Sequence, residues 1–291
     1  MEKIYDSAYK YIFSNKTIFC QLIKSFVNED FVKKINVDNI DLLDKSFVSD
    51  EFLQRESDII YRVKLGKNDI YIYILLEFQS TVDKTIPVRM LLYLIQFYDL
   101  LFRNSQKGKL PSVFPILIYN GQDDWIIPSN IKDLIDKRIP EKYIPSFEYY
   151  SIIEKNISDE VLLKIHNLAS AIIYLEKIKD EKKLKEAIDR AIKLIEKENI
   201  IDVRMFTIWF KRLFNQKVSP VEIAKINNLL EAKTMLTSVA DQILERGKKE
   251  GIKEGIKEGK IEDARNLKKE GIPIKIISKC TGLTKEEIEE L

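Results

Sequence analysis

The sequence has few of the residues that build thiol- and histidine-based active sites. Its 291 residues include one histidine, His166, and two cysteines, Cys20 and Cys280. Zinc sites of Cys and His, Ser-His-Asp triads and Cys-His dyads that need a second ligand or a second histidine are therefore disfavoured. Because His166 lies in a helical apolar pattern without a chemical partner nearby, we expect a structural histidine. The widely separated cysteines form no disulfide framework, which fits a reducing compartment.

The chain also has no recognisable secretory leader and no long uncharged apolar run. The segment "MEKIYDSAYKYIF" lacks a basic region followed by an apolar stretch. Even the apolar segment "MLLYLIQFYDLLF" carries Asp99. We therefore expect a cytoplasmic protein without a membrane span.

Charge of one sign is not in excess. The 48 basic and 46 acidic side chains give a formal net charge of +2, and 45 % of the residues are hydrophobic. This composition predicts a globular chain in which any nucleic-acid surface must come from local arrangement.

The first half of the chain has the pattern of an α/β domain. Residues 6–27 have helical spacing interrupted near Ser14 and Asn15, and 57–65 and 69–79 read as two hairpin strands flanking "GKND". Residues 87–102 then predict a helix that opens with Pro87, and 112–119 predict a further strand. Strand, helix and strand in this order predict a crossover and an α/β layer.

The later part of the chain is helical throughout. The pattern changes at about residue 155, so we predict a core of 1–155, a helical region of 156–240 that packs on the core or follows it, and a tail of 241–291.

The second hairpin strand ends with polar residues in "ILLEFQS". If the hairpin turns between Lys67 and Asn68, Asp58 faces Glu77, and Gln79 shares the face of Glu77. Two carboxylates placed directly opposite are destabilising unless a cation lies between them. A hard ion such as Mg²⁺ fits this cluster and would support phosphodiester cleavage. The alternative is that Asp58 and Glu77 are exposed residues at strand ends, and a one-residue change of register would break the pairing.

Several segments occur together in a specific order: "DSAYKYIFS", "RESDIIYRV", "ILLEFQS", "IPVRMLLYLIQFY", "PILIYNG" and then Trp125. This ordered set resembles the recombination-promoting nuclease and putative transposase family, a branch of the PD-(D/E)XK nuclease superfamily. The resemblance is strong over residues 1–150 and looser through the helical region to "TGLTKEEI".

The resemblance implies a mixed β-sheet flanked by helices and a Mg²⁺-dependent endonuclease that cuts DNA in recombination or transposition, with Mn²⁺ as an alternative ion. It implies catalytic roles for Asp58, Glu77 and Gln79, and metal contacts at Asp58, Glu77 and Phe78. Gln79 occupies the position of the superfamily's usual lysine, so it can orient water but supplies no positive charge. Lys10 is then a candidate catalytic cation, and Arg89 is another. The chain also departs from the superfamily motif in lacking a proline before Asp58.

The helix after the hairpin carries a polar stripe, Arg89, Tyr93 and Gln96, at positions i, i+4 and i+7. These residues either hold DNA phosphate and steady the carboxylates, or they form the solvent face of the helix.

Two further pairs are candidates for supporting the site. Asp6 and Lys10 lie one helical turn apart and could equally form a surface ion pair. Tyr119 and Asn120 end a strand and could line the same cleft or belong to a simple turn.

The tail has glycine at every fourth position, Gly247, Gly251, Gly255 and Gly259, between Lys and Glu residues. Each glycine inside a helix costs about 1 kcal/mol relative to alanine, which contact with a second helix could offset. We therefore expect a homodimer formed through the tail, with a flexible charged linker as the alternative. Two short helices should follow, the second opening with a capping box of Thr284 and Glu287. Because that second helix is acidic, packing or dimerisation is favoured over binding in a DNA groove.

Three classes of function stay open at this point. The leading one is a Mg²⁺-dependent DNA endonuclease, the second is a catalytically inactive relative that binds DNA or a partner, and the third is a helical assembly protein.

Overall fold

The structure is a computed structural model that describes residues 2–43, 59–66, 68–77, 82–104 and 109–291, without the side chains of 2–6, 68, 76, 77 and 104. Within these ranges the chain divides into two compact units, Met1–Val239 and Ala240–Leu291. The helical region and the α/β core, on either side of residue 155, thus belong to one unit.

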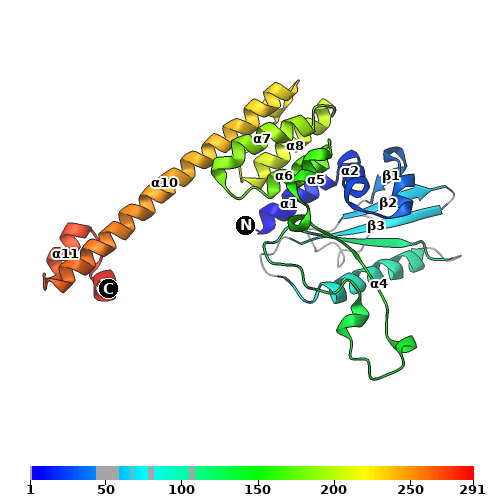
Figure 1. Ribbon diagram of the computed structural model, residues 1–291, viewed down its shortest axis with the longest axis horizontal. Coiled ribbons are helices and arrows are strands. Elements are labelled where there is room, and N and C mark those ends of the chain that lie inside the picture. Colours follow the sequence, from blue (N-terminus) through cyan, green and yellow to red (C-terminus); the bar gives the residue numbers. More distant parts are fainter. Residues whose placement is uncertain (1, 44–58, 67, 78–81, 105–108) are drawn as a thin grey trace. The chain divides into compact units, whose positions relative to one another are not determined.

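The first unit is built on a five-stranded mixed sheet with the order β1-β2-β3-β4-β5 (Figure 1). The strands are β1 (Ile40–Leu42), β2 (Ile59–Leu65), β3 (Asn68–Glu77), β4 (Val113–Tyr119) and β5 (Tyr150–Ile153). The pairs β1–β2 and β2–β3 are antiparallel, whereas the pairs β3–β4 and β4–β5 are parallel. The predicted mixed sheet with flanking helices is confirmed.

The register of the β2–β3 hairpin differs from the predicted one. Leu65 pairs with Asn68 and Ile59 pairs with Ile74, which excludes the register that a turn between Lys67 and Asn68 would give. Gly66 has a φ of 66°, which a glycine adopts without strain. Over the described residues of the two strands, the predicted register is therefore wrong by two residues, while the position of Asp58 itself lies outside the described residues.

One face of the sheet is covered by α4 (Ile86–Asn104), which connects β3 to the parallel strand β4 (Figure 1). Met90, Tyr93 and Phe97 of this helix pack on Tyr73 and Leu117 of the sheet, and all five side chains are buried. The helical spacing of these residues is what brings one stripe of α4 onto the strands.

The opposite face is covered by α1 (Glu2–Phe13) and α2 (Lys16–Phe26) (Figure 1). The break between them lies where the sequence predicts it, because the Asn15 side chain caps α2. The Tyr61 hydroxyl of β2 donates to the Phe13 carbonyl at 2.7 Å, and its ring stacks on Phe19 at 3.9 Å. These contacts fix the end of α1 on the sheet.

The helical region packs against α1. Its helices are α5 (Asp159–Lys164), α6 (Leu168–Glu176), α7 (Leu184–Leu194), α8 (Ile200–Leu213) and α9 (Pro220–Ala224). Trp209 of α8 lies edge-on to Tyr9 of α1, and Asn15 donates to Asp202 at 2.9 Å. α1 is thus enclosed between the sheet and the helices.

Short 3-10 helices connect several of these elements: η1 (Asp30–Lys34), η2 (Val37–Asn39), η4 (Ile131–Leu134), η5 (Glu141–Tyr143), η6 (Glu154–Asn156) and η7 (Glu181–Lys183). His166 lies in the connection between α5 and α6 and is exposed. The prediction of a structural histidine within a helix is therefore wrong.

The long helix α10 (Leu229–Lys269) continues from the first unit into the second, which also holds α11 (Ile274–Thr281) and α12 (Lys285–Glu289). Ala264, Ile277, Leu283 and Ile288 form a small core there. The predicted capping box at the start of α12 is present. No helix in the described ranges combines the length and the apolar character needed to cross a membrane.

Candidate functional site

The carboxyl ends of the three parallel strands meet at one edge of the sheet. The main chain of Tyr119 in β4 pairs with Glu77 of β3 on one side and with Ile153 of β5 on the other. Sites in α/β proteins commonly lie beyond such strand ends. The residues at the ends of β3, β4 and β5 are therefore the first candidates for a functional site.

Most of the predicted metal site lies outside the described residues. This holds for Asp58, Phe78 and Gln79 as a whole and for the side chains of Asp6 and Glu77. Glu77 is placed through its main chain alone, as the last residue of β3. The roles assigned to these residues stay predictions.

Arg89 at the start of α4 has acidic and phenolic partners. Its guanidinium lies 2.7 Å from the Asp83 carboxylate and donates to the Tyr93 hydroxyl at 3.1 Å. Burial acts to raise the pKa of Asp83, but hydrogen bonds from Thr85 and Arg89 lower that pKa below its ordinary value. Arg89 thus ties Asp83, which precedes α4, to the first turns of the helix.

The predicted stripe on α4 is not a uniform surface. Tyr93 is buried in the core beside Tyr73, whereas Gln96 is exposed. Tyr119 is also buried, with its ring 4.9 Å from that of Trp125. The structure thus brings Arg89 and Tyr93 together. Gln96 lies in solvent instead, and Tyr119 lies in the core.

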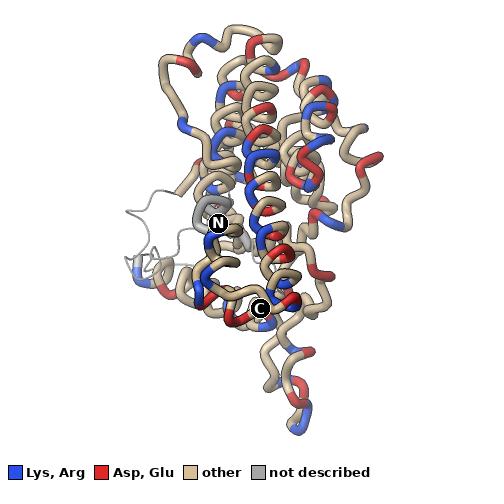
Figure 2. Tube along the Cα trace, turned by 90° about the vertical axis from the view of Figure 1, so that its left-hand side faces the viewer, with Lys and Arg blue, Asp and Glu red and all other residues tan. Residues whose placement is uncertain are grey.

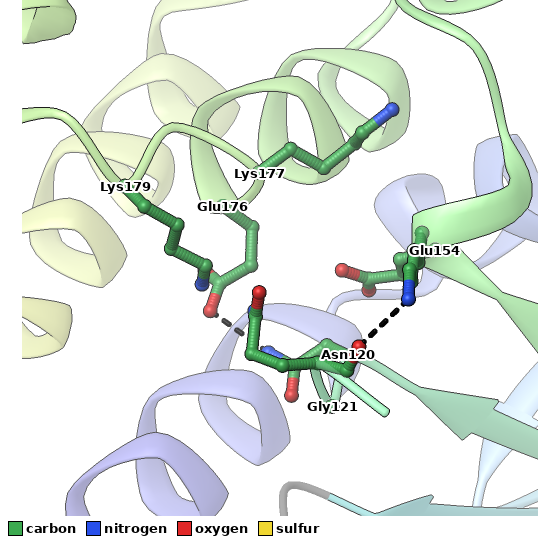
Figure 3. Close-up of a pocket in the computed structure, with 8 residues that line it drawn as sticks. Asn120, Gly121, Glu154, Glu176, Lys177 and Lys179 are labelled. Carbon is green, nitrogen blue, oxygen red and sulfur yellow. Dashed lines mark hydrogen bonds between the residues drawn. The ribbon is translucent and has the colours of Figure 1, made fainter. Parts of the chain in front are cut away.

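Asn120, the residue after β4, belongs to a buried polar cluster on the α1 side of the sheet. Its amide nitrogen donates to the Glu176 carboxylate at 2.8 Å (Figure 3). The same nitrogen lies 3.5 Å from the Tyr9 hydroxyl. Glu154, which directly follows β5, extends its carboxylate toward Glu176 and Asn120 in the same view. We call Tyr9, Asn120, Glu154 and Glu176 the diglutamate cluster.

The two glutamates are almost fully buried. Glu154 is 1 % exposed and Glu176 is 5 % exposed. Among the described residues, neither oxygen of Glu154 has a hydrogen-bond partner, and Oε2 of Glu176 has none either. A buried ionised carboxylate without partners is strongly destabilising, so the cluster is incomplete as a charged site.

Burial is also the main influence on the acidity of the pair. It raises the pKa of Glu154 well above its ordinary value, and the nearby Glu176 carboxylate raises it further. Burial raises the pKa of Glu176 to about 7, while Lys179, the Tyr9 hydroxyl and the hydrogen bond from Asn120 act in the opposite direction. The protonated form of the pair is thus favoured at and below neutral pH.

The diglutamate cluster lines a pocket of about 90 Å³ that also has Gly121, Gln122 and three lysines in its wall. Lys155 bonds Asp124 and the Gln122 carbonyl, and Lys177 bonds Asp159 and the Ile157 carbonyl. Lys179 is exposed.

Sequence reasoning placed Asn120 among the candidates but missed Tyr9, Glu154 and Glu176. One signal was present for Glu176, because it ends the apolar run "LASAIIYLE" of α6, all of which is buried. No comparable signal marked Glu154, since the four-residue strand before it is too short to predict.

In the described ranges, no three His, Cys, Asp or Glu side chains lie close enough to hold a metal ion. The diglutamate cluster therefore offers two carboxylates and no third acidic ligand.

A family model described as "Putative transposase, YhgA-like" matches residues 3–204. This is more than half of the chain and includes every residue of the predicted metal site. The chain belongs to this family.

Relatives of the chain are named recombination-promoting nucleases. It is 22 % identical to RpnA of Escherichia coli (strain K12), over 84 % of the chain and 81 % of RpnA. It is 26 % identical to RpnD of Escherichia coli O157:H7, over 38 % of the chain and 47 % of RpnD. A third relative, RpnE of strain K12, is 21 % identical over 89 % of the chain and 88 % of RpnE, and is named an inactive nuclease-like protein. No solved structure matches the chain significantly.

Proposed function

We propose that the chain is a Mg²⁺-dependent DNA endonuclease that hydrolyses phosphodiester bonds in recombination or transposition. The observation that carries this proposal is the similarity to RpnA, which extends over 84 % of the chain. The family match supports it because residues 3–204 include Asp58, Glu77 and Gln79.

The donor set fits the ion. Asp58 and Glu77 contribute carboxylates, and Phe78 can contribute only its main-chain carbonyl. All the protein ligands are therefore the hard oxygens that Mg²⁺ prefers, and Mn²⁺ accepts the same donors. When bound, such an ion lowers the pKa of a coordinated water and stabilises charge on the phosphoryl oxygens. Glu77 ends β3 at the carboxyl edge of the parallel strands, where a substrate can approach.

The remaining groups would act on water and phosphate. The Gln79 amide can accept and donate hydrogen bonds to the attacking water, but it supplies no positive charge. Arg89 is held by Asp83 and Tyr93, which favours a positioning role near the end of β3 over direct phosphate binding. Lys10, in the last turn of α1, is the second cation proposed for the site.

Binding of DNA would depend on local charge. Figure 2 shows Lys and Arg interspersed with Asp and Glu along the described helices, consistent with the net charge of +2. Because no excess of basic residues attracts DNA to the whole molecule, a few cations close to the scissile phosphate would carry most of the attraction.

An inactive binding protein is the second candidate function. RpnE, which is named inactive, matches the chain over a share of its length as large as that of RpnA. The replacement of the usual lysine by Gln79 also agrees with a loss of catalysis. Membership of the family alone therefore does not separate the two candidates.

A plasmid cleavage assay tests the proposal. The parent chain should nick or linearise plasmid DNA in Mg²⁺ and stop when EDTA is added. Asp58→Ala and Glu77→Ala should each abolish cleavage while the far-UV circular dichroism stays unchanged. Glu160→Ala, a change of an exposed acidic residue on α5, is the matched control and should cleave at the parental rate.

Two results would contradict the proposal. Cleavage at the parental rate by both Asp58→Ala and Glu77→Ala would show that the site is misassigned. A parent chain that binds DNA without cutting it in Mg²⁺ or Mn²⁺ would favour the inactive binding protein.

The proposal includes self-association through the tail. An added Cβ at Gly251, Gly255 or Gly259 would meet no atom of this chain within 4 Å, so nothing in the described part of the chain packs on these glycines. Ile252 and Ile256 on the same segment of α10 are 64 % and 57 % exposed. A second copy of the helix would cover these side chains, and a two-fold arrangement is the commonest closed form.

A further inference from the structure

The strongest feature outside the proposed nuclease site is the pocket of the diglutamate cluster. It lies between the ends of β4 and β5 and the last turn of α6, all within the first unit. We propose that this pocket binds a small divalent cation, with Glu154 and Glu176 as its protein ligands. Neither Glu154 nor Glu176 belongs to the set proposed for cleavage.

Most carboxylate oxygens of the pocket lack a hydrogen-bond partner among the described residues. Both oxygens of Glu154 are buried without a hydrogen-bond partner in the described part of the chain, and they face the pocket (Figure 3). Glu176 uses one oxygen for Asn120, and its Oε2 has no partner among the same residues. Three carboxylate oxygens of residues that line one pocket thus lack a hydrogen-bond partner within the described ranges. A cation would satisfy them together.

Two of the three lysines that line the pocket are already paired with aspartates. Lys155 and Lys177 line the pocket but are already paired with Asp124 and Asp159, at 2.7 and 2.9 Å. Lys179 is exposed, so solvent screens its attraction to the carboxylates. A divalent ion that displaces the protons of the two glutamates would neutralise the charge of both carboxylates together.

The pocket is small. The pocket holds about 90 Å³, whereas pockets for organic ligands are typically about 300 Å³ or larger. Since a water molecule occupies about 30 Å³, the space suits an ion with two or three waters and excludes a nucleotide. Mg²⁺ and Mn²⁺ bind in this way, with one or two carboxylates and several retained waters.

Asn120 has a positioning role in this site. Its amide nitrogen holds Oε1 of Glu176, so the other oxygen of that carboxylate is directed to a defined place. The last turn of α6 adds unfavourable charge near Glu176, because the helix C-terminus is the negative end of the helix dipole. A bound cation would offset both the like charge of Glu154 and this helix end.

The test measures ion binding in full-length chain from which the proposed catalytic ligands have been removed. In an Asp58→Asn/Glu77→Gln background, electron paramagnetic resonance of free Mn²⁺ should reveal one bound ion per chain that Mg²⁺ displaces. Adding Glu154→Gln should weaken this binding at least about tenfold, the smallest loss usual even for residues that only orient ligands. Adding Glu160→Gln, the exposed control, should leave it unchanged.

Thermal denaturation gives a second readout that does not depend on cleavage. Mg²⁺ should raise the midpoint of the background chain, because an ion that binds only the folded state stabilises it. Glu154→Gln should remove this rise. If Glu154→Gln fails to fold, Glu176→Gln replaces it, since its amide oxygen can still accept from Asn120.

No Mn²⁺ bound by the background chain, or binding that Glu154→Gln leaves intact, would overturn the proposal. Either result would mean that protons alone neutralise the pair. Failure of the proposed nuclease function is a separate outcome, because it is scored by plasmid cleavage in the parent chain.

Discussion

Replacing Glu176 by glutamine should remove much of the pH dependence of stability in metal-free buffer. The glutamine is nearly isosteric, and its amide oxygen can keep the hydrogen bond from Asn120. What changes is the charge, since the introduced amide cannot ionise. The variant therefore separates the electrostatic contribution of this side chain from its packing.

The sign and magnitude follow from the pKa of Glu176, which is about 7 in the folded chain against an ordinary value of 4.5. Between these values the folded chain holds a proton that the unfolded chain releases, so the free energy of unfolding falls as pH rises. The loss is complete above about pH 7. Each pKa unit corresponds to about 1.4 kcal/mol, which gives a total of about 3 kcal/mol for this group.

Urea denaturation in EDTA between pH 5 and pH 8 measures the effect. The parent should lose about 2.5 kcal/mol of unfolding free energy over this interval, or more if Glu154 also ionises. Glu176→Gln should lose much less, because it lacks the ionising group and relieves Glu154 of a like charge. Glu160→Gln should behave as the parent. Parallel curves for the parent and Glu176→Gln would refute the reasoning, because another group would then carry the pH dependence.

Three further predictions concern other parts of the chain. Gln79→Lys should retain or raise Mg²⁺-dependent cleavage and Gln79→Leu should lower it strongly; equal rates would mean that residue 79 does not face the ion. The double change Gly251→Leu/Gly255→Leu should turn a dimer into a monomer in light scattering, and a parent already monomeric at micromolar concentration would contradict the tail proposal. Tyr61→Phe should lower the free energy of unfolding by about 1–3 kcal/mol in urea, because it leaves a buried main-chain carbonyl without its donor; the exposed Tyr143→Phe should change it little.

Local signals predicted the elements of the sheet but not their exact pairing. The hairpin, α4 and β4 were recognisable because apolar spacing and turn residues act over a few neighbours. The register was misjudged because "GKND" offers two places for a two-residue turn. Gly66 decides between them, since the first turn residue has a positive φ.

In the candidate sites too, contacts between residues close in sequence were predictable, whereas contacts between separate elements were not. Arg89 and Tyr93 were predicted together because positions i and i+4 of a helix are neighbours whatever the tertiary fold is. Glu154 and Glu176 were not, because they come from separate elements, the end of β5 and the end of α6, that meet only when the helical region packs on the sheet. Their partnership depends on tertiary structure and has no local pattern.

Strand β4 links the two candidate sites. Its last residue, Tyr119, pairs through the main chain with Glu77 on one side and Ile153 on the other, so both of its hydrogen-bonding edges are used. A strand held on both edges is strongly restrained, and the next residue, Asn120, therefore leaves the sheet from a fixed point to hold Glu176. The hydrogen-bond ladder that sets the main chain of Glu77 thus also sets the pocket of the diglutamate cluster. Because the two candidate sites lie on neighbouring strand ends, an ion at the buried glutamates would stabilise the part of the sheet that holds the main chain of Glu77.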